Sequence, residues 1–575
     1  MERVQQLIRV VIIVLSIPYG LAWANNDENV DRGNSGDQGC FYLQGNDSTP
    51  IEAIAMDVNP DFESLDTELT IGEVLVSSRS VFDESNPAEN HFLYRLANDY
   101  HTNTRLYVVR QQLLFKPGDR YAPRLLEESA RLLRKSNYLY DARVVPYRVC
   151  GQRVDILVIT RDIWTLYPSV SFSRSGGENK SGIGLEDNNI LGTGNRVNFS
   201  YHNDDERSGY TFAYKTENLL GSRVNLRSHF SNNSDGNIAK LSLNRPFYAL
   251  DARWAAGFGF NQEDREDTFY SKGEKADQFA HFIEGFDVYY GWSNGLVRDY
   301  TSRWTLGFTR EAHTFEDIEF DSGFLDALPA DRTYAYPWVN FERVENDYSI
   351  YSNLDTLHRT EDVHVGLRLN MKLGYAAKSL GSTANYLVFD SSGEDRLVAT
   401  ESDIIKHSFS LGGYWNTDIE EPENLLGEYR ISLHHKTHDD RSLFAEFSLS
   451  AAKNLTSDNQ MTLGGNSGLR GYDKNLRDGD RRMLFRLERR QFYNIHLFNL
   501  IHIGSAMFFD VGRIWHGGSD PKGEDGYLKD VGVGLRLSSS KAQSGRVVHL
   551  DFAYPLDDIE GAGGFQWLVT IKESF

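Results

Sequence analysis

The sequence has few cysteines, few basic residues and no long apolar run beyond its first residues. Two cysteines in 575 residues exclude a disulfide-rich scaffold and zinc sites of the Cys-x-x-Cys type. No later stretch approaches the roughly 20 apolar residues of a membrane-spanning helix. With 60 Lys and Arg against 82 Asp and Glu, and no basic stripe, nucleic acid is excluded as a partner. A membrane β-barrel is not excluded, because its strands are apolar only at alternate positions.

Signatures of catalysis are also missing. There is no GxSxG, HExxH or P-loop motif, and the 16 histidines show no metal-ligand spacing. We therefore expect a protein that is not an enzyme and uses no metal or cofactor, although a Ser/His phospholipase pair on adjacent strands stays open. The acidic clusters 204–206, 263–267 and 418–421 are interpreted as solvated loops, with divalent-cation binding at a lipopolysaccharide surface as the alternative.

Residues 1–24 have the three parts of a secretory signal peptide. Two arginines precede the apolar run Val10–Leu15, and Ala22-Trp23-Ala24 has the small-x-small pattern of a cleavage site. The alternative is a membrane anchor, which the short apolar run and the acidic, Asn-rich sequence after it disfavour. The mature chain is therefore predicted to be exported.

The exported chain starts with a polar segment. Residues 25–67 are rich in Asn, Asp, Gly, Glu and Ser without sustained periodicity, which predicts a disordered leader. A disulfide between Cys40 and Cys150 is permitted in an oxidising compartment. Two unpaired thiols are the alternative, and the sequence does not decide between them.

Residues 68–165 alternate between strand and helix signals. The expected elements are a strand, a helix, a second strand-like piece, a helix that starts at a proline, and a hairpin: Ile71–Phe82, His91–Tyr100, Val108–Phe115, the segment from Pro123, and Ala142–Thr160. This order predicts one small α+β domain.

Residues 166–575 change to strict alternation of apolar and polar positions. Val531, Val533 and Leu535 alternate with Gly532, Gly534 and Arg536, for example, and aromatic residues lie toward strand ends. This pattern predicts a transmembrane antiparallel β-barrel of about 16 strands, with several segments between 262 and 440 forming hairpins in external loops. A soluble sandwich or propeller is the alternative, although no blade-length repeat is present.

Particular motifs resemble a known family. Leu114–Tyr121 and Val158–Trp164 are similar to a polypeptide-transport-associated (POTRA) domain, and Asp187–Gly194 resembles the turn after the second barrel strand. The most specific match is Leu463–Tyr472, which contains an Arg-Gly-aromatic signature. On these residues the chain resembles the outer-membrane assembly-factor superfamily, the BamA/TamA-like proteins, in which POTRA domains precede a surface-antigen-type barrel.

The resemblance implies an ion-paired loop inside the barrel. In the family the signature arginine lies on a loop that folds back into the barrel and meets acidic residues of the next two strands. Here these residues are Arg470, Glu488 and Asp510, and alternation separately places both acids opposite the lipid-facing positions. Gly468, Gly471 and Tyr472 complete the loop tip. We call this predicted set the loop lock.

The last strand resembles the family's C-terminal assembly signal. Trp567, Val569, Ile571 and Phe575 form its alternating row, which Glu573 interrupts.

The resemblance also implies a location and a function. The POTRA-like domain would lie in the periplasm, and the barrel in the bacterial outer membrane would insert or translocate polypeptides, or lipids, through a lateral gate. The expected partners are outer-membrane lipid and lipopolysaccharide, unfolded outer-membrane or secreted client polypeptides, and periplasmic accessory proteins. The chain departs from family members with several POTRA copies. A solute channel or surface-binding barrel without assembly activity is therefore the alternative.

Overall fold

The computed structural model describes residues 40–44, 51, 54, 65, 68–319, 328–354, 356–357, 360–465, 467–517, 526–541, 546–559 and 564–572. The predicted signal peptide, most of the predicted leader and Phe575 lie outside these residues. The chain forms two compact units. The smaller comprises the described residues up to Leu75 with Lys116–Ala122 and Val145–Leu157, and the larger comprises Val76–Phe115, Pro123–Val144 and the chain from Val158 onward.

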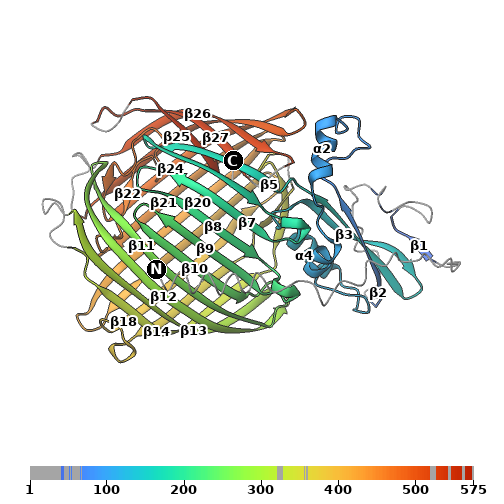
Figure 1. Cartoon of the computed structure of the whole chain (residues 1–575), viewed down its shortest axis with the longest axis horizontal. Helices are drawn as coiled ribbons and strands as arrows, with labels where there is room; N and C mark the ends of the chain where they lie inside the picture. The colour runs from blue at the N-terminus through green and yellow to red at the C-terminus, as the bar shows by residue number, and fades with distance from the viewer. Residues whose placement is uncertain are drawn as a thin grey trace. The chain divides into compact units, whose positions relative to one another are not determined.

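A four-stranded sheet has the order β1–β3–β4–β2 (Figure 1). Its strands are β1 (Cys40–Tyr42), β2 (Thr70–Arg79), β3 (Leu139–Cys150) and β4 (Arg153–Asp162). β3 and β4 form the expected hairpin, and Gly151 at their turn has a φ of 62°, a left-handed conformation that favours glycine. Val154, Ile156 and Val158 of β4 are fully buried.

The first strand corrects one expectation. Cys40–Tyr42 lies in the segment predicted to be a disordered leader, and for these residues that prediction is wrong. β1 pairs with β3 so that Cys40 lies opposite Cys150, and a disulfide joins the two residues. The Tyr42 ring packs edge-on against Tyr147, with the ring centroids 5.6 Å apart. A three-residue strand is too short to show in the composition of the segment around it.

Among its described residues the larger unit has three α-helices: α2 (Phe92–Tyr100), α3 (Leu106–Gln112) and α4 (Pro123–Arg134). The strand predicted at Val108–Phe115 is wrong, because α3 occupies most of it. Val108, Val109 and Gln112 are the buried residues of α3, and a spacing of one and four places them on one helical face. α4 begins at its proline as expected. Across the described ranges no helix is both long and apolar enough to cross a membrane.

Twenty of the described strands close into one antiparallel barrel (Figure 1). The barrel strands are β5 (Leu166–Ser175), β6 (Glu178–Asp187), β7 (Arg196–Asn203), β8 (Ser208–Thr216), β9 (Asn225–Asn233), β10 (Gly236–Arg245), β11 (Trp254–Ser271), β12 (Glu274–Val297), β13 (Tyr300–Glu319), β14 (Arg332–Glu345), β17 (Arg368–Ala376), β18 (Tyr386–Ala399), β19 (Asp403–Asn416), β20 (Glu421–His438), β21 (Arg441–Lys453), β24 (Arg481–Leu497), β25 (Ile501–Trp515), β26 (Leu528–Ser539), β27 (Val547–Pro555) and β28 (Gln566–Lys572).

The prediction of about 16 strands is therefore wrong. It assigned several segments between residues 262 and 440 to hairpins in external loops, whereas β11–β14 and β17–β20 are continuous with the barrel wall. Among the described residues two short pairs stand apart from the barrel, β15 (Tyr348–Ser352) with β16 (Thr360–His364) and β22 (Thr462–Leu463) with β23 (Arg477–Asp478). Alternation is the same in a long loop hairpin and in a wall strand, so it cannot count wall strands.

The two faces of the wall differ as alternation predicts. On β26, Val533 has 51% of its surface exposed, whereas the alternate residues Asp530 and Arg536 are 0% exposed. On β27, Phe552 and Tyr554 are exposed while His549 and Asp551 are buried. The barrel therefore has an apolar outer face and a polar, charged inner face, as expected for a barrel surrounded by lipid.

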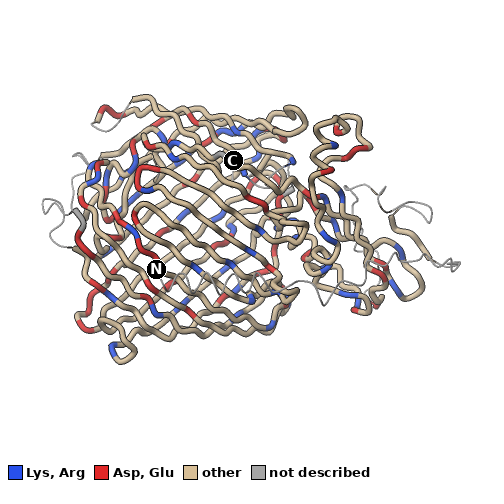
Figure 2. The backbone as a smooth tube through the Cα atoms, in the orientation of Figure 1, with Lys and Arg blue, Asp and Glu red and all other residues tan. Residues whose placement is uncertain are grey.

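The antiparallel order defines two rims. The hairpin turns at 176–177, 204–207, 234–235 and 272–273 lie at one end, which we call the distal rim. The connections at 188–195 and 217–224 lie at the other end, the proximal rim. Figure 2 shows acidic residues gathered at the distal rim, at the left of the view.

We expect the disulfide to stabilise the smaller unit. It joins residues 110 positions apart, and closing a loop of that length stabilises the folded state by about 4–5 kcal/mol in the chain-entropy model. The double variant Cys40→Ser/Cys150→Ser should therefore expose β1 and β3 to proteases at lower denaturant concentrations than in the wild type. A reducing agent should bring the wild type to the behaviour of the variant. Equal protease resistance of oxidised and reduced protein would contradict this role.

Candidate functional site: an ion-paired loop inside the barrel

The chain between β21 and β24, residues 454–480, folds back against the inner face of the barrel; we call it the inner loop. Its short strands β22 and β23 pair with each other. Buried apolar residues of the loop pack against wall residues of β24, β25 and β26: Met461, Leu463, Leu469, Tyr472 and Leu476 against Leu484, Ile514 and Leu528. This apolar contact by itself stabilises the position of the loop against the wall, in addition to the ion pairs described below.

Arg470 lies at the centre of the loop lock. Its Nε and Nη2 donate to the two carboxylate oxygens of Asp510 at 2.7 and 2.9 Å, and its Nη1 donates to Glu488 at 2.7 Å. The guanidinium carbon also lies 3.4 Å from the centroid of the Phe508 ring. The Arg470 side chain is 9% exposed and that of Asp510 is 0% exposed. A bidentate, charge-assisted pair of this kind fixes both position and orientation.

Further charged groups surround the lock. Arg490 donates to the second oxygen of Glu488 at 3.2 Å, and Asp551 lies 3.7 Å from Arg470 while it also binds Arg536. Burial lowers the pKa of Arg470, but Asp510, Glu488 and Asp551 outweigh burial, so that the net pKa is raised above its ordinary value. Arg470 therefore stays charged at any physiological pH.

The loop tip is bonded through its backbone and its tyrosine. Gly471 donates its N–H to Asp530 at 3.1 Å, and the Tyr472 hydroxyl donates to the Lys529 carbonyl or to Asp557, each at 2.8 Å. Gly468 has a φ of 125°, and a Cβ there would lie 2.4 Å from a methyl group of Leu484. Glycine is needed at this position because of both its conformation and the close approach of the wall.

The inner loop also bonds the first and last barrel strands. Ser175, the last residue of β5, donates its hydroxyl to the Gly465 carbonyl at 3.1 Å, and Lys474 donates its N–H to the Gly176 carbonyl at 2.9 Å. Gln566, the first residue of β28, donates to Asp473 at 3.0 Å. The loop therefore spans the junction at which the barrel closes.

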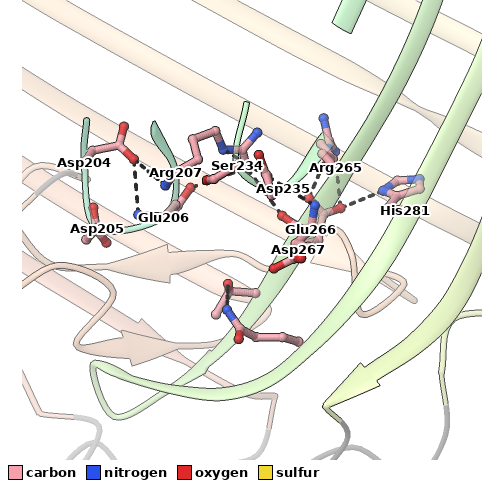
Figure 3. Close-up of polar contacts among 12 residues, drawn as sticks. Asp204, Asp205, Glu206, Arg207, Ser234, Asp235, Arg265, Glu266, Asp267 and His281 are labelled. Carbon is pink, nitrogen blue, oxygen red and sulfur yellow. Dashed lines mark hydrogen bonds and ion pairs between the residues drawn. The ribbon is translucent and has the colours of Figure 1, made fainter. Parts of the chain in front are cut away.

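Lys474 also binds the turn between β7 and β8. Its ammonium lies 3.1 Å from Asp205 and 2.8 Å from Glu206, and Figure 3 shows these two acids beside Arg207. Burial raises the pKa of Glu206, but the hydrogen bonds and charges of Lys474, Tyr270 and Arg207 together outweigh burial and leave the net pKa below its ordinary value. The cluster 204–206 is thus an ion-paired turn. The interpretation of 263–267 as a loop is wrong, because these residues lie inside β11.

Of the predicted C-terminal signal, Trp567, Val569 and Ile571 lie on β28, whereas Phe575 is outside the described residues. Trp567 and Ile571 are exposed on the outer face. The Trp567 ring contacts β5 across the junction, with its centroid 6.1 Å from that of Phe172 and 5.3 Å from the Arg174 guanidinium carbon. These outward side chains therefore contribute to closing the barrel.

A cavity of about 600 Å³ borders the lock on the inner face. Its lining is strongly charged and includes these residues, besides Arg470 and Glu488: Lys406, Arg430, Glu446, Arg486, Arg490, Asp551 and Lys572. A lining with both charge signs suits water and polar chains rather than an apolar ligand.

Solved structures with a similar fold are found among bacterial proteins. BamA from Haemophilus ducreyi lacking POTRA domains 1–3 is 10% identical, with a TM-score of 0.39 over 87% of this chain and 84% of that chain. CdiB from Acinetobacter baumannii is 13% identical (TM-score 0.42, 88% and 73% covered), and CdiB from Escherichia coli is 10% identical (TM-score 0.36, 91% and 93%). No protein-family model and no curated protein matches the chain. Likenesses this weak do not establish a function.

No sequence motif identifies the residues that connect the lock to the rest of the barrel. These residues are Arg490 and, at the barrel junction, Gln566 and Asp473. Alternation places Arg536 and Asp551 on the inner face, which is a usable signal. It does not say which inner-face residues on different strands meet, because that depends on strand register.

We expect Arg470→Ala to loosen the inner loop. The change leaves Asp510 buried without its bidentate partner and Glu488 with Arg490 alone, and breaking a buried ion pair typically costs about 3–5 kcal/mol of folding free energy. Denaturant unfolding in detergent measures the effect, together with trypsin cleavage after Lys474 and Arg477, which the variant keeps. Arg470→Lys should be intermediate, because it keeps the charge without the bidentate geometry. The matched control is Arg481→Ala, whose side chain is 55% exposed. Equal unfolding of Arg470→Ala and this control would contradict the lock.

Proposed function

We propose that the protein is a bacterial outer-membrane barrel of the BamA/TamA type that inserts or translocates client polypeptides, or lipids, without enzymatic chemistry. The observation that carries this proposal is the junction between the first and last barrel strands. The apolar outer face suits a lipid surrounding, and the charged inner face suits polar chains. The part of the chain that resembles a POTRA domain is proposed to lie in the periplasm.

The proposed gate is the junction of β5 and β28. Among the described residues, Val569 opposite Arg174 is the one register pair that joins these strands. The neighbouring strands β27 and β28 pair continuously from Val547–Lys572 to Ala553–Gln566. Within the described part of these strands, opening the β5–β28 junction would therefore break fewer backbone hydrogen bonds than opening the β27–β28 junction. The exposed strand edges would then be available to a client strand.

The proposed capture site for clients is β2. This strand ends the four-stranded sheet, and a bridge from Thr70 to Arg120 covers only its start. A client strand adding along the remaining edge would gain backbone hydrogen bonds with little dependence on its sequence. This mode suits clients that share β-structure rather than a single motif.

A series of contacts links α4 to the loop lock within the larger unit. Arg134 of α4 makes a bidentate pair with Asp362 of β16, at 2.6 and 2.7 Å. Leu354 lies between β15 and β16, and its carbonyl accepts a hydrogen bond from Arg490. Arg490 in turn binds Glu488 of the lock. We propose that events at α4 bias the lock through this hairpin.

We expect this link to appear as an energetic coupling. A double-mutant cycle of Asp362→Ala with Arg470→Ala, read out as trypsin cleavage of the inner loop, should give a coupling of about 0.5–2 kcal/mol. The matched control cycle combines Asp418→Ala with Arg470→Ala. Asp418 pairs with Lys378, which is not part of this series of contacts, so these two changes should not couple. Strict additivity of Asp362→Ala and Arg470→Ala would remove the link from the mechanism while leaving the gate untouched.

The central test locks the gate. In a Cys40→Ser/Cys150→Ser background, Arg174→Cys and Val569→Cys should form a disulfide that abolishes client insertion in reconstituted liposomes, and reduction should restore it. The control pair is Val533→Cys with Phe552→Cys, opposite residues of the continuously paired β26 and β27. This control should insert clients normally.

The alternative function is a solute channel or surface-binding barrel, which the charged cavity favours. Full client insertion with the gate locked would overturn the gate mechanism. Absence of client insertion in the wild type, together with steady conductance in planar bilayers, would favour the channel instead.

A further inference from the structure

Two histidines face each other on the inner wall near the distal rim, away from the loop lock. His281 of β12 and His313 of β13 approach with Nε2 of the first 2.9 Å from Nδ1 of the second. The His281 side chain is 2% exposed and that of His313 is 12% exposed. Two imidazole nitrogens at this distance need a proton or a cation between them, because their lone pairs would otherwise repel each other.

The outer nitrogens of this pair are both bonded to carboxylates. Nδ1 of His281 lies 2.6 Å from Asp267, a contact drawn in Figure 3, and Nε2 of His313 lies 2.8 Å from Glu311. A carboxylate accepts hydrogen bonds only, so each imidazole places its proton on its outer nitrogen. The two inner nitrogens then face each other with lone pairs at 2.9 Å, which is repulsive unless a cation lies between them.

A third ligand comes from the inner loop. Asp458 has an oxygen within 4.8 Å of both histidine nitrogens. Its side chain is 4% exposed; one of its oxygens binds Arg332, and the other, Oδ1, has no hydrogen-bond partner within the described part of the chain. Burying an unpartnered carboxylate oxygen is costly, and coordination of a cation would remove that cost. Gln460 brings this segment to the wall through two hydrogen bonds to the Tyr270 backbone.

We propose that His281, His313 and Asp458 bind a divalent transition-metal ion, with Zn²⁺ the best fit. Two imidazole nitrogens and a carboxylate oxygen form a usual zinc ligand set, with a fourth position open to water. Zinc bonds of about 2.0–2.1 Å need the two nitrogens roughly 3.3 Å apart, only a few tenths of an ångström beyond their present separation. In many proteins a zinc-bound imidazole donates its other N–H to a carboxylate that orients the ring. Asp267 and Glu311 would have this role here.

The metal would connect the entry of the inner loop to the barrel wall. Asp458 precedes the loop lock in the chain, whereas the two histidines belong to neighbouring wall strands. The inner loop would then be held at two places, by an ion pair at Arg470 and by the metal at Asp458. This inference does not depend on the proposed transport function, since it concerns only how the loop is held.

The test measures zinc binding to the purified full-length protein in detergent after removal of metals with a chelator. Equilibrium dialysis with elemental analysis should find one Zn²⁺ per chain. His281→Ala and His313→Ala should weaken binding at least 100-fold, and Asp458→Ala at least tenfold. Glu311→Gln should weaken it by about 10–100-fold, the usual effect of losing an outer-shell partner. The matched control is His435→Ala, because His435 also bonds a carboxylate, Asp403, but is 42% exposed and is not part of the cluster.

Two outcomes would overturn the proposal. One is a wild type that takes up no stoichiometric zinc, which would leave a proton shared between the imidazoles as the explanation of their contact. The other is that Asp458→Ala and Glu311→Gln both bind zinc with the same affinity as the wild type. If a histidine variant does not fold, as judged by its heat-dependent gel mobility, these two variants decide the question. Glu311 is 41% exposed, so Glu311→Gln removes no buried wall side chain. Asp458 also pairs with the buried Arg332, so the folding of Asp458→Ala is checked by the same gel mobility.

Discussion

The ion pair of Arg470 with Asp510 and Glu488 is the interaction on which the interior of this barrel depends. A barrel of twenty strands is too wide for its wall side chains to fill, which leaves room for a segment of the chain in the interior. The inner loop has little regular secondary structure, so few backbone hydrogen bonds of its own hold its conformation. Its apolar residues hold it against β24–β26, and the guanidinium fixes its register against the wall, because a bidentate pair tolerates little displacement.

The same loop gives the barrel junction its closure. Among the described residues β5 and β28 are joined by a single register pair, and the inner loop adds bonds to Ser175, Gly176 and Gln566 on both sides of that junction. The junction is therefore closed largely by hydrogen bonds of the inner loop and by side-chain contacts rather than by backbone pairing between the two strands. An arrangement of this kind can open by releasing the loop without unfolding the wall, which is why the lock and the gate belong to one mechanism in the proposed function.

The proposed metal site would add a second constraint on the same segment. Arg470 holds the middle of the inner loop and Asp458 lies near its start, so that the two sites restrict different parts of it. They also differ in chemistry, because the lock is an ion pair made only of the protein's own side chains, whereas a metal site responds to the supply of the ion. The inner loop would therefore be held by one constraint that needs no ligand and by one that depends on the metal.

Much of this was accessible in the sequence. Period-two alternation determined the barrel class and the inner or outer face of residues such as Val533 and Asp551, because side-chain direction in a strand follows from position alone. The resemblance around Arg470 named both acids of the lock. Strand number, closure of β5 on β28 and the meeting of His281, His313 and Asp458 were decided only by the tertiary structure. These features depend on register between strands and on the path of the inner loop, which bring together residues far apart in the chain and leave no local pattern.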